Sequence, residues 1–452
     1  MNTPGRILIV GGLAAGPAAA AKAKRLNPKL EITLFEQGEH ISYATCSMPY
    51  YIGDTIKSSD ELIAFSPENF EKEKGCEVKT LHRVEELMPH RKKIAVLDLK
   101  EGKRKEYKYD RLLLATGAKI VVFNPAWLEA RNVFVVKTLA DSIRLKQYID
   151  THHPQQAVIV GGGFIGMEMA DALRSRNMNV MIMHSGPEPM NSLEPESRRI
   201  VLDELQRNEV RFFGEQRLKE ILVHDGMATH VVTTSEKRTC DLVILATGFS
   251  PNADLARAAH IRCGKLNGIV VDDYLKTGAD HVYAAGACCE LTNLVSGKPM
   301  VSPLATVSNK MGWAAGSNLA GHPTVYQGSV RTSVVKVFDL EVASVGLSER
   351  EAQLEGFRVL TESVIGQSKG RHYPGRKSIF VKLIVDRSSK HLLGANLIAE
   401  EGAAQRINVL STAIAANMTI ADIAQLDLMY TPPFSPLWDP LLIAANKTLK
   451  RL

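Results

Sequence analysis

One pattern occurs twice in this chain: an apolar strand, a glycine-rich turn and the start of a helix. The first copy has a strand at 6–10, the turn Gly-Gly-Leu-Ala-Ala-Gly at 11–16 and an alanine-rich helix. The second has a strand at 157–160 and the turn Gly-Gly-Gly-Phe-Ile-Gly at 161–166. Glycine lets the backbone approach a pyrophosphate, and the first turn of a helix offers it free N–H groups. The pattern therefore predicts an α/β fold with two dinucleotide-binding units.

Each copy continues in the same way. A second strand follows the helix and ends at Glu36 in the first copy and at His184 in the second. Further downstream, each copy has an apolar strand that closes in Ala-Thr-Gly, at 115–117 and at 246–248. A carboxylate at the position of Glu36 accepts hydrogen bonds from a ribose. One glycine motif is weak, but two copies with matching downstream strands indicate an internal duplication.

Length and composition indicate a globular, multidomain protein. The chain has 452 residues, of which 45% are hydrophobic, enough for two or three domains with cores. Its 55 basic and 49 acidic residues give a net charge of +6, far from the clustered basicity of a nucleic-acid binder. No apolar run approaches membrane-spanning length, and the N-terminus leads into a strand without room for a signal peptide. We expect a cytoplasmic protein that binds neither nucleic acid nor membrane.

A single thiol lies where a helix is expected to begin. Cys46 belongs to the phrase Ser-Tyr-Ala-Thr-Cys-Ser-Met-Pro-Tyr at 42–50. Pro49 is tolerated only in the first turn of a helix, so Cys46 is expected at the helix N-terminal end, where the dipole favours a thiolate. A cysteine taken alone is more often a small buried apolar residue. No Cys-x-x-Cys pair accompanies Cys46, and the six scattered cysteines indicate thiols rather than disulfides, so we expect no metal site.

Together these features resemble the pyridine nucleotide-disulfide oxidoreductases over almost the whole chain. The resemblance implies FAD at the first glycine turn, NADPH or NADH at the second, and a return of the chain to the flavin domain at 277–286. It implies two Rossmann-like dinucleotide-binding domains and a C-terminal α+β dimerisation domain. The expected segments are the FAD domain at 1–118, the NAD(P) domain at 119–248, the second FAD segment at 249–327 and the dimerisation domain at 328–452.

The resemblance also assigns nucleotide-binding residues, with one departure. They are Gly11, Gly12, Ala14, Ala15, Gly16, Glu36, Thr116, Gly117, Gly161, Gly163, Phe164, Ile165, Gly166, His184, Thr247, Gly248, Gly286 and Ala287. The family places an aspartate at the position of Ala287, and losing one charge-assisted hydrogen bond costs about 1.5–3 kcal/mol of flavin binding unless another group substitutes. We interpret the following pair, Cys288 and Cys289, as a packed strand-to-helix turn rather than a redox pair.

The choice of nicotinamide cofactor depends on His184. Aligning the two copies places His184 where Glu36 stands in the first. A carboxylate there repels a 2′-phosphate and binds a 2′-hydroxyl, whereas His184 imposes no such repulsion. We expect NADPH to be used at least as well as NADH, unless His184 is simply a solvated strand end.

Within the family, the phrase at 42–50 resembles that of the coenzyme A disulfide reductases, whose relatives include NADH oxidases, NADH peroxidases and persulfide reductases. The peroxidases and many oxidases carry a histidine where this chain has Ala14. Without a partner cysteine, the oxidised state is expected to be a mixed disulfide between Cys46 and a small thiol. Two alternatives stay open: an NADH oxidase with a Cys46 sulfenic acid, and a nucleotide-binding protein without turnover, which Leu13 and Ala287 favour.

Two phrases of the C-terminal third extend the resemblance, at 371–375 and 429–440. In coenzyme A disulfide reductases a tyrosine in each faces the partner's cysteine, which implies catalytic roles for Tyr373 and Tyr430 and a homodimer with shared active sites. A phenol can donate a proton to a leaving thiolate. The alternative is that both are turn or interface aromatics.

The expected ligand is coenzyme A, as a disulfide or persulfide, bound by Lys22, Arg25, Ser42 and Thr45. Coenzyme A carries phosphates, which basic side chains suit, and Lys22 and Arg25 lie on one face of the first helix. Arg25 and Ser42 match positions that contact the coenzyme in the resembled reductases. Thr45 replaces an asparagine common there, and Lys22 replaces an uncharged residue. The alternative is a solvated helix face.

Overall fold

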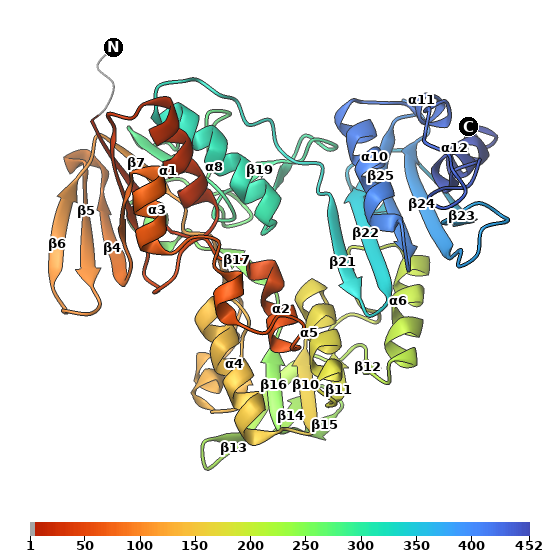
Figure 1. Ribbon diagram of the computed structural model, residues 1–452, viewed down its shortest axis with the longest axis horizontal. Helices are drawn as coiled ribbons and strands as arrows, with labels where there is room; N and C mark the ends of the chain where they lie inside the picture. Colours follow the sequence, from red (N-terminus) through yellow and green to blue (C-terminus); the bar gives the residue numbers. More distant parts are fainter. Residues whose placement is uncertain (1–4) are drawn as a thin grey trace.

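The computed structural model describes residues 5–452, so the predicted absence of a signal peptide concerns residues 1–4, which lie outside the described part. Three regions, each built on its own five-stranded sheet, lie around a common centre (Figure 1). The predicted α/β fold is confirmed. Within residues 5–452 no helix combines the length and the apolar composition that a membrane crossing requires.

The first region is a parallel sheet in the order β18-β7-β1-β2-β3. Its strands are β1 (Arg6–Val10), β2 (Glu31–Phe35), β3 (Glu77–Lys79), β7 (Arg111–Leu114) and β18 (Val282–Ala284). Because β18 pairs with β7 across a long intervening segment, two separate parts of the chain build this sheet. Helix α1 (Ala15–Leu26) packs closely on α8 (Ala305–Leu319): a Cβ added to Gly312 would lie 2.3 Å from the Ala15 carbonyl oxygen.

The second region repeats this arrangement with the strand order β12-β11-β10-β16-β9. Its strands and helices are β9 (Val133–Phe134), β10 (Gln156–Val160), β11 (Asn179–Met183), β12 (Arg211–Phe213), β16 (Leu242–Leu245), α4 (Leu139–His152), α5 (Phe164–Ser175) and α6 (Pro195–Arg207). The neighbours β11-β10-β16 correspond to β2-β1-β7 of the first region. The central strands are apolar and buried over 157–160, 180–183 and 242–245, as expected for parallel strands covered on both faces.

The third region is an antiparallel sheet in the order β21-β22-β25-β24-β23, with helices on one face. Its elements are β21 (Ser333–Val337), β22 (Leu340–Gly346), β23 (Val359–Gln367), β24 (Ser378–Asp386), β25 (Leu392–Ala399), α9 (Glu349–Leu354), α10 (Ala403–Ala415), α11 (Ile420–Ala424) and α12 (Pro440–Leu449). The apolar segments at 332–345 and 379–385 form β21, β22 and β24, and the stretch that follows β25 forms α10. The other sheet face shares one core with the second region, through Val342 and Met167 among others.

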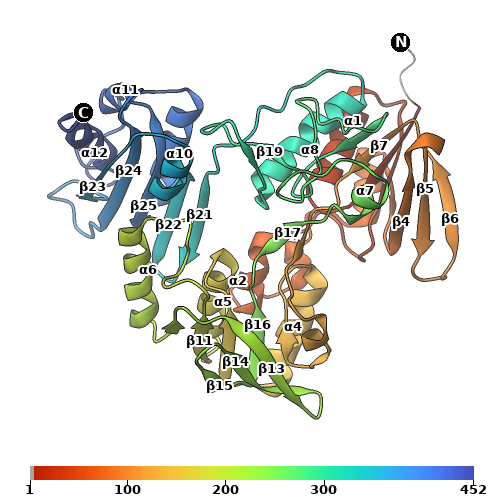
Figure 2. The same ribbon diagram turned by 180° about the vertical axis from the view of Figure 1, so that it is seen from behind.

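The remaining elements join or flank these regions. They are α2 (Met48–Ile52), α3 (Pro67–Lys74), α7 (Asp254–Ala258), β4 (His82–Met88), β5 (Lys93–Asp98), β6 (Arg104–Lys108), β8 (Ala118–Ile120), β13 (Leu218–His224), β14 (Met227–Thr233), β15 (Lys237–Thr239), β17 (Phe249–Pro251), β19 (Leu291–Thr292) and β20 (Pro299–Met300), with short 3₁₀ turns at Thr45–Ser47, Ser59–Leu62, Pro89–Arg91 and Pro125–Glu129. The antiparallel pair β8–β17 lies where the chain leaves the first region and returns to it (Figure 2).

The predicted domain boundaries at residues 118, 248 and 327 stay predictions. Strand pairing shows which segments share a sheet, but it does not show which segments fold independently.

Candidate active site

The two glycine turns make the same close contacts. Gly11 has φ 111° and Gly161 has φ 118°. A Cβ added to either would lie 2.1 Å from the carbonyl oxygen of the alanine in the downstream Ala-Thr-Gly. A Cβ on Gly16 or Gly166 would lie 1.9 or 2.0 Å from the carbonyl oxygen of the first glycine. Larger residues therefore do not fit these four positions, and the duplication extends to the backbone contacts of both turns.

The residue after the second strand accepts a hydrogen bond from the turn in both copies. The Gly12 N–H donates to Glu36 Oε2 at 2.8 Å, and the Gly162 N–H donates to His184 Nδ1 at 3.2 Å. His184 Nδ1 therefore carries no proton, which leaves the ring proton on Nε2. That Nε2 is buried and has no hydrogen-bond partner within the described residues. Burial lowers the pKa of His184 against an opposing contribution from the Asn191 side chain, which favours the neutral ring already indicated by the acceptor role of Nδ1.

A cavity of about 390 Å³ opens beside the first turn. Glu36 and Thr116 line it, and the Thr116 hydroxyl donates to the Asn252 carbonyl oxygen at 2.6 Å. A Cβ on Gly163 would meet nothing within 4 Å, whereas the corresponding position of the first turn carries the Leu13 side chain. The close glycine contacts, the carboxylate and the cavity together fit FAD at the first turn.

The segment after β18 lacks a carboxylate that faces the flavin position. Ala287 is buried, and the next acid, Glu290, accepts a hydrogen bond from the Leu266 N–H at 2.6 Å. Cys288 and Cys289 are fully buried with their Sγ atoms 3.8 Å apart, so the packed turn is confirmed. The expected helix after it is wrong: the chain enters the β19–β20 hairpin, because the apolar residues there pair across two short strands.

Cys46 lies in the 3₁₀ turn immediately before α2, and Pro49 lies in the first turn of that helix, as predicted. The Ser42 N–H donates to the Gly12 carbonyl oxygen at 2.9 Å, which holds this segment against the first glycine turn. Of the six cysteines, all within the described residues, Cys46 alone is exposed. Burial raises the pKa of Cys76 to about 11, which keeps that thiol protonated. The accessible thiol therefore lies between the two nucleotide-binding regions.

Glu168 is a residue that the sequence analysis missed. It lies on α5, one turn after the second glycine turn, and burial raises its pKa to about 7. Burial, then Glu168, Asp171 and Cys46, raise the pKa of Tyr50, so these groups lie within electrostatic reach of one another. A glutamate in a helix usually lies on a solvated face, so the sequence did not single out Glu168. The available sequence signal for a functional role was its position two residues after Gly166.

Lys137 is a second missed residue. Burial lowers its pKa, against the opposing influence of Asp141 and Glu36. Tyr43 lies in the same neighbourhood, and burial followed by the charge of Glu36 raises its pKa to about 12. The sequence did not indicate that this lysine would be buried, because the residues around it come from both nucleotide-binding regions.

One of the two cations expected to bind phosphate, Lys22, lies against an aromatic side chain. Lys22 Nζ lies 3.8 Å from the ring centroid of Trp313 on α8, whose side chain is 47% exposed. Arg25 and Lys310 are exposed on the same two helices. Among the described residues, none of the three cations has a carboxylate within 4.0 Å. Trp313 was not predicted, because a tryptophan in a helix more often belongs to a core.

Tyr373 and Tyr430 lie apart from Cys46 within one chain. They are 39% and 51% exposed, in the loops after β23 and before α12. Both views place α2 in the lower part of the molecule and the helices of the third region on the opposite upper side (Figure 1, Figure 2). Around Tyr430, the apolar residues Met429, Phe434 and Trp438 are also exposed. The two tyrosines therefore belong to the third region, whereas the thiol precedes α2, which packs on the second.

Comparison with known proteins agrees with this architecture. The pattern of the pyridine nucleotide-disulphide oxidoreductases matches residues 5–312, and that of their dimerisation domain matches residues 332–440. The NAD(P)H sulfur oxidoreductase (CoA-dependent) of Pyrococcus abyssi is 34% identical over 444 residues, 97% of both chains.

Two solved structures are similar over nearly the whole chain. The structure of reduced Bacillus anthracis CoADR-RHD has a TM-score of 0.96 at 31% identity, covering 100% of this chain and 81% of that one. The NAD-dependent persulfide reductase from A. fulgidus has a TM-score of 0.95 at 33% identity, covering 99% and 83%. The chain therefore belongs to the pyridine nucleotide-disulphide oxidoreductases and carries their dimerisation domain.

Proposed function

We propose that this protein is an NAD(P)H-dependent flavoprotein reductase of a coenzyme A disulfide or persulfide, acting through a mixed disulfide at Cys46. The observation that carries the proposal is the single exposed thiol, held at a helix start between two nucleotide-binding turns. Relatives named CoA-dependent sulfur oxidoreductase, coenzyme A polysulfide/persulfide reductase and coenzyme A disulfide reductase support the substrate class.

The first glycine turn, Glu36 and Thr116 would hold FAD, which supplies hydride acceptance and two-electron transfer when bound. The Cys46 thiolate attacks one sulfur of the substrate disulfide; the new S–S bond forms as the old one breaks, and the first thiolate leaves with a proton. Two electrons from NAD(P)H then break the Cys46 mixed disulfide and release the second thiol. The balance is NAD(P)H, one proton and one disulfide giving NAD(P)⁺ and two thiols.

We propose that the active unit is a homodimer in which the partner subunit's Tyr373 and Tyr430 complete the site. Their exposure on the dimerisation domain, amid exposed apolar side chains, supports this arrangement. A phenol there donates the proton that the leaving thiolate needs, or holds a sulfur in position.

The distance along α1 favours a long thiol. The Ser42–Gly12 hydrogen bond holds the Cys46 segment at the start of α1, and Arg25 lies near the other end of that helix. At 1.5 Å per residue, Ala15 and Arg25 are roughly 15 Å apart along the axis. A ligand that reaches both Cys46 and Arg25 therefore needs a thiol well separated from its phosphates, as in coenzyme A.

The first experiment replaces the thiol. Cys46→Ser is expected to leave reduction of the bound flavin by NAD(P)H intact and to abolish disulfide turnover, because the sulfur that forms the mixed disulfide is gone. Mass spectrometry of the wild-type protein, denatured without reductant, is expected to show coenzyme A attached to Cys46. Substantial disulfide reductase activity in Cys46→Ser would contradict the mechanism and direct attention to Cys288 and Cys289.

The second experiment tests the substrate. Arg25→Ala is expected to raise KM for coenzyme A disulfide far more than KM for cystine, which has no phosphate. Lys29→Ala, an exposed cation just beyond the same helix, is the matched control and is expected to change neither value. Equal effects of Arg25→Ala on both substrates would indicate a different small thiol.

An NADH oxidase is the second candidate function. A protein of that name from Methanocaldococcus jannaschii is 30% identical over 448 residues, 99% of both chains. Against it, Ala14 leaves the first turn without the histidine expected of many oxidases. Oxygen consumption with NADH that exceeded disulfide reduction and required Cys46 would favour this candidate.

A further inference from the structure

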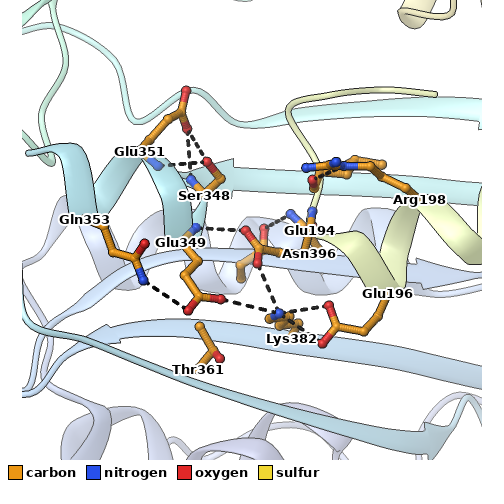
Figure 3. Close-up of polar contacts among 12 residues, drawn as sticks. Glu194, Glu196, Arg198, Ser348, Glu349, Glu351, Gln353, Thr361, Lys382 and Asn396 are labelled. Atoms are coloured by element: carbon orange, nitrogen blue, oxygen red, sulfur yellow. Dashed lines mark hydrogen bonds and ion pairs between the residues drawn. The ribbon is translucent and has the colours of Figure 1, made fainter. Parts of the chain in front are cut away.

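Lys382 lies at the centre of an ion cluster between the second and third regions, in which Lys382 and Glu194 are buried, Glu196 is exposed and Glu349 is half-buried (Figure 3). Its Nζ is 3.0 Å from Glu194, 2.9 Å from Glu196 and 3.9 Å from Glu349. The side chains of Lys382 and Glu194 are only 5% and 3% exposed. Lys382 comes from β24 of the third region, whereas Glu194 and Glu196 come from the start of α6 in the second. The cluster therefore connects α6, which follows a strand of the second sheet, to the sheet of the third region.

Both the side chain and the backbone of Glu194 are held by the third region. Its Oε1 accepts a hydrogen bond from the Glu349 N–H at 2.8 Å, beside the Lys382 ion pair. Its own N–H donates to Asn396 Oδ1 at 2.7 Å. Lys382 and Asn396 face each other in register across β24 and β25 (Figure 3). The position of residue 194 thus depends on two neighbouring strands of the third region.

Glu194 ends the loop that begins at His184 of the second nucleotide-binding unit. Within this loop the Met190 N–H donates to the Gly162 carbonyl oxygen at 2.8 Å. A Cβ added to Gly186 would lie 3.1 Å from His184 Nε2 and 2.8 Å from Asn191 Oδ1, so the loop closes around Nε2 of His184. The loop 185–193 is therefore attached to the glycine turn on one side and to the third region on the other.

We propose that Lys382 is a positioning residue for the nicotinamide nucleotide: by holding Glu194, it keeps the loop 185–193 in the shape that receives the ribose beside His184. The inference rests on the proposed assignment of NAD(P)H to the second glycine turn. Without Lys382 the Glu194 carboxylate is buried with no cation, so it moves toward solvent and takes the end of the loop with it. Nucleotide binding must then reorder the loop, and the affinity falls.

The test is Lys382→Met in the FAD-loaded enzyme. The dissociation constants of NADP⁺ and NAD⁺ are measured by titration, and the KM for NAD(P)H and kcat by steady-state kinetics. We expect at least a tenfold rise in the dissociation constant and in KM, with kcat at saturating NAD(P)H changed less than twofold and FAD content unchanged. The matched control is Lys336→Met, which removes the 2.6 Å pair with Asp171 between the same two regions but outside the loop. It is expected to change the dissociation constant less than twofold.

A milder variant keeps the test decisive if Lys382→Met does not fold. Glu194→Gln retains the shape and the backbone hydrogen bond to Asn396 but loses the charge, and is expected to weaken nucleotide binding several-fold. Variants that lower the thermal midpoint while leaving nucleotide affinity within twofold of the wild type would overturn the inference and make the cluster purely structural. A wild-type protein that bound neither nucleotide would overturn the site assignment as well.

Discussion

The two glycine turns have the same backbone and different side chains. Gly11 and Gly161 make equivalent contacts, but the acceptor of the turn N–H is the Glu36 carboxylate in one copy and the neutral His184 ring in the other. The helix position that holds Glu168 in α5 is held by Ala18 in α1. Contacts that a Cβ would disrupt therefore define the shared fold, and we propose that the side chains that differ between the copies decide which nucleotide each accepts.

The two copies also differ in what surrounds them. Helix α1 packs on α8 within the first region, but α5 contacts α2 and β21, and the loop after His184 is held by the third region. The helix that packs on α1 belongs to the same region as the first copy. The second copy depends on contacts with neighbouring parts of the chain. We therefore expect substitutions far away in the sequence to change its affinity for the nucleotide.

The largest expected effect comes from substitutions that test which nucleotide binds at each glycine turn. Gly161→Ala places a Cβ 2.1 Å from a carbonyl oxygen at a positive φ, which costs about 3 kcal/mol, or roughly a hundredfold in nucleotide affinity. We expect it to retain FAD and lose reduction by NAD(P)H, while Gly11→Ala loses FAD. Flavin content and anaerobic reduction are the measurements. The opposite pattern would exchange the two assignments.

The next largest effect concerns the carboxylate that is absent at Ala287. Ala287→Asp supplies a carboxylate where Glu290 does not substitute, because Glu290 is bonded to the Leu266 N–H. A charge-assisted hydrogen bond there is expected to tighten FAD binding by about 1.5–3 kcal/mol. FAD retention through gel filtration and the thermal midpoint with added FAD measure it. Unchanged retention would show that other groups already satisfy the flavin.

A smaller effect comes from making the second copy resemble the first. His184→Glu restores a carboxylate acceptor for the Gly162 N–H and repels a 2′-phosphate, so the kcat/KM ratio of NADPH to NADH is expected to fall about tenfold. His184→Gln, which adds no charge, is the control. A wild-type ratio that strongly favours NADH would refute the expectation that NADPH is used at least as well.

The smallest effect concerns Glu168, whose pKa burial raises from 4.5 to about 7. A carboxyl with a raised pKa favours folding while it is protonated, and this contribution is lost as the pH rises from about 4.5 through about 7. Glu168→Gln stays neutral. Its thermal midpoint is expected to match the wild type near pH 4 and to exceed it by about 2–4 °C above pH 7. A difference independent of pH would mean that the carboxyl does not titrate there.

The sequence by itself determined the features that depend on neighbouring residues. The two strand–glycine–helix units and the position of Cys46 before Pro49 follow from local backbone requirements, and the structure has both; the return to the first sheet within 277–286, which β18 forms, was implied by the family resemblance. The α/β fold follows from the repetition of these units. The cytoplasmic location and the roles of individual site residues stay predictions, since they depend on more than local pattern.

Only the tertiary structure decided which distant groups meet. It placed Lys22 over Trp313 and joined Lys382 to Glu194. It also placed Tyr430 on the surface of the third region, among other exposed apolar side chains. The physical reason is that turns and helix starts are set by the φ, ψ and N–H groups of a few consecutive residues, whereas ion pairs and buried carboxyls gain their energies from surroundings assembled by packing whole regions together.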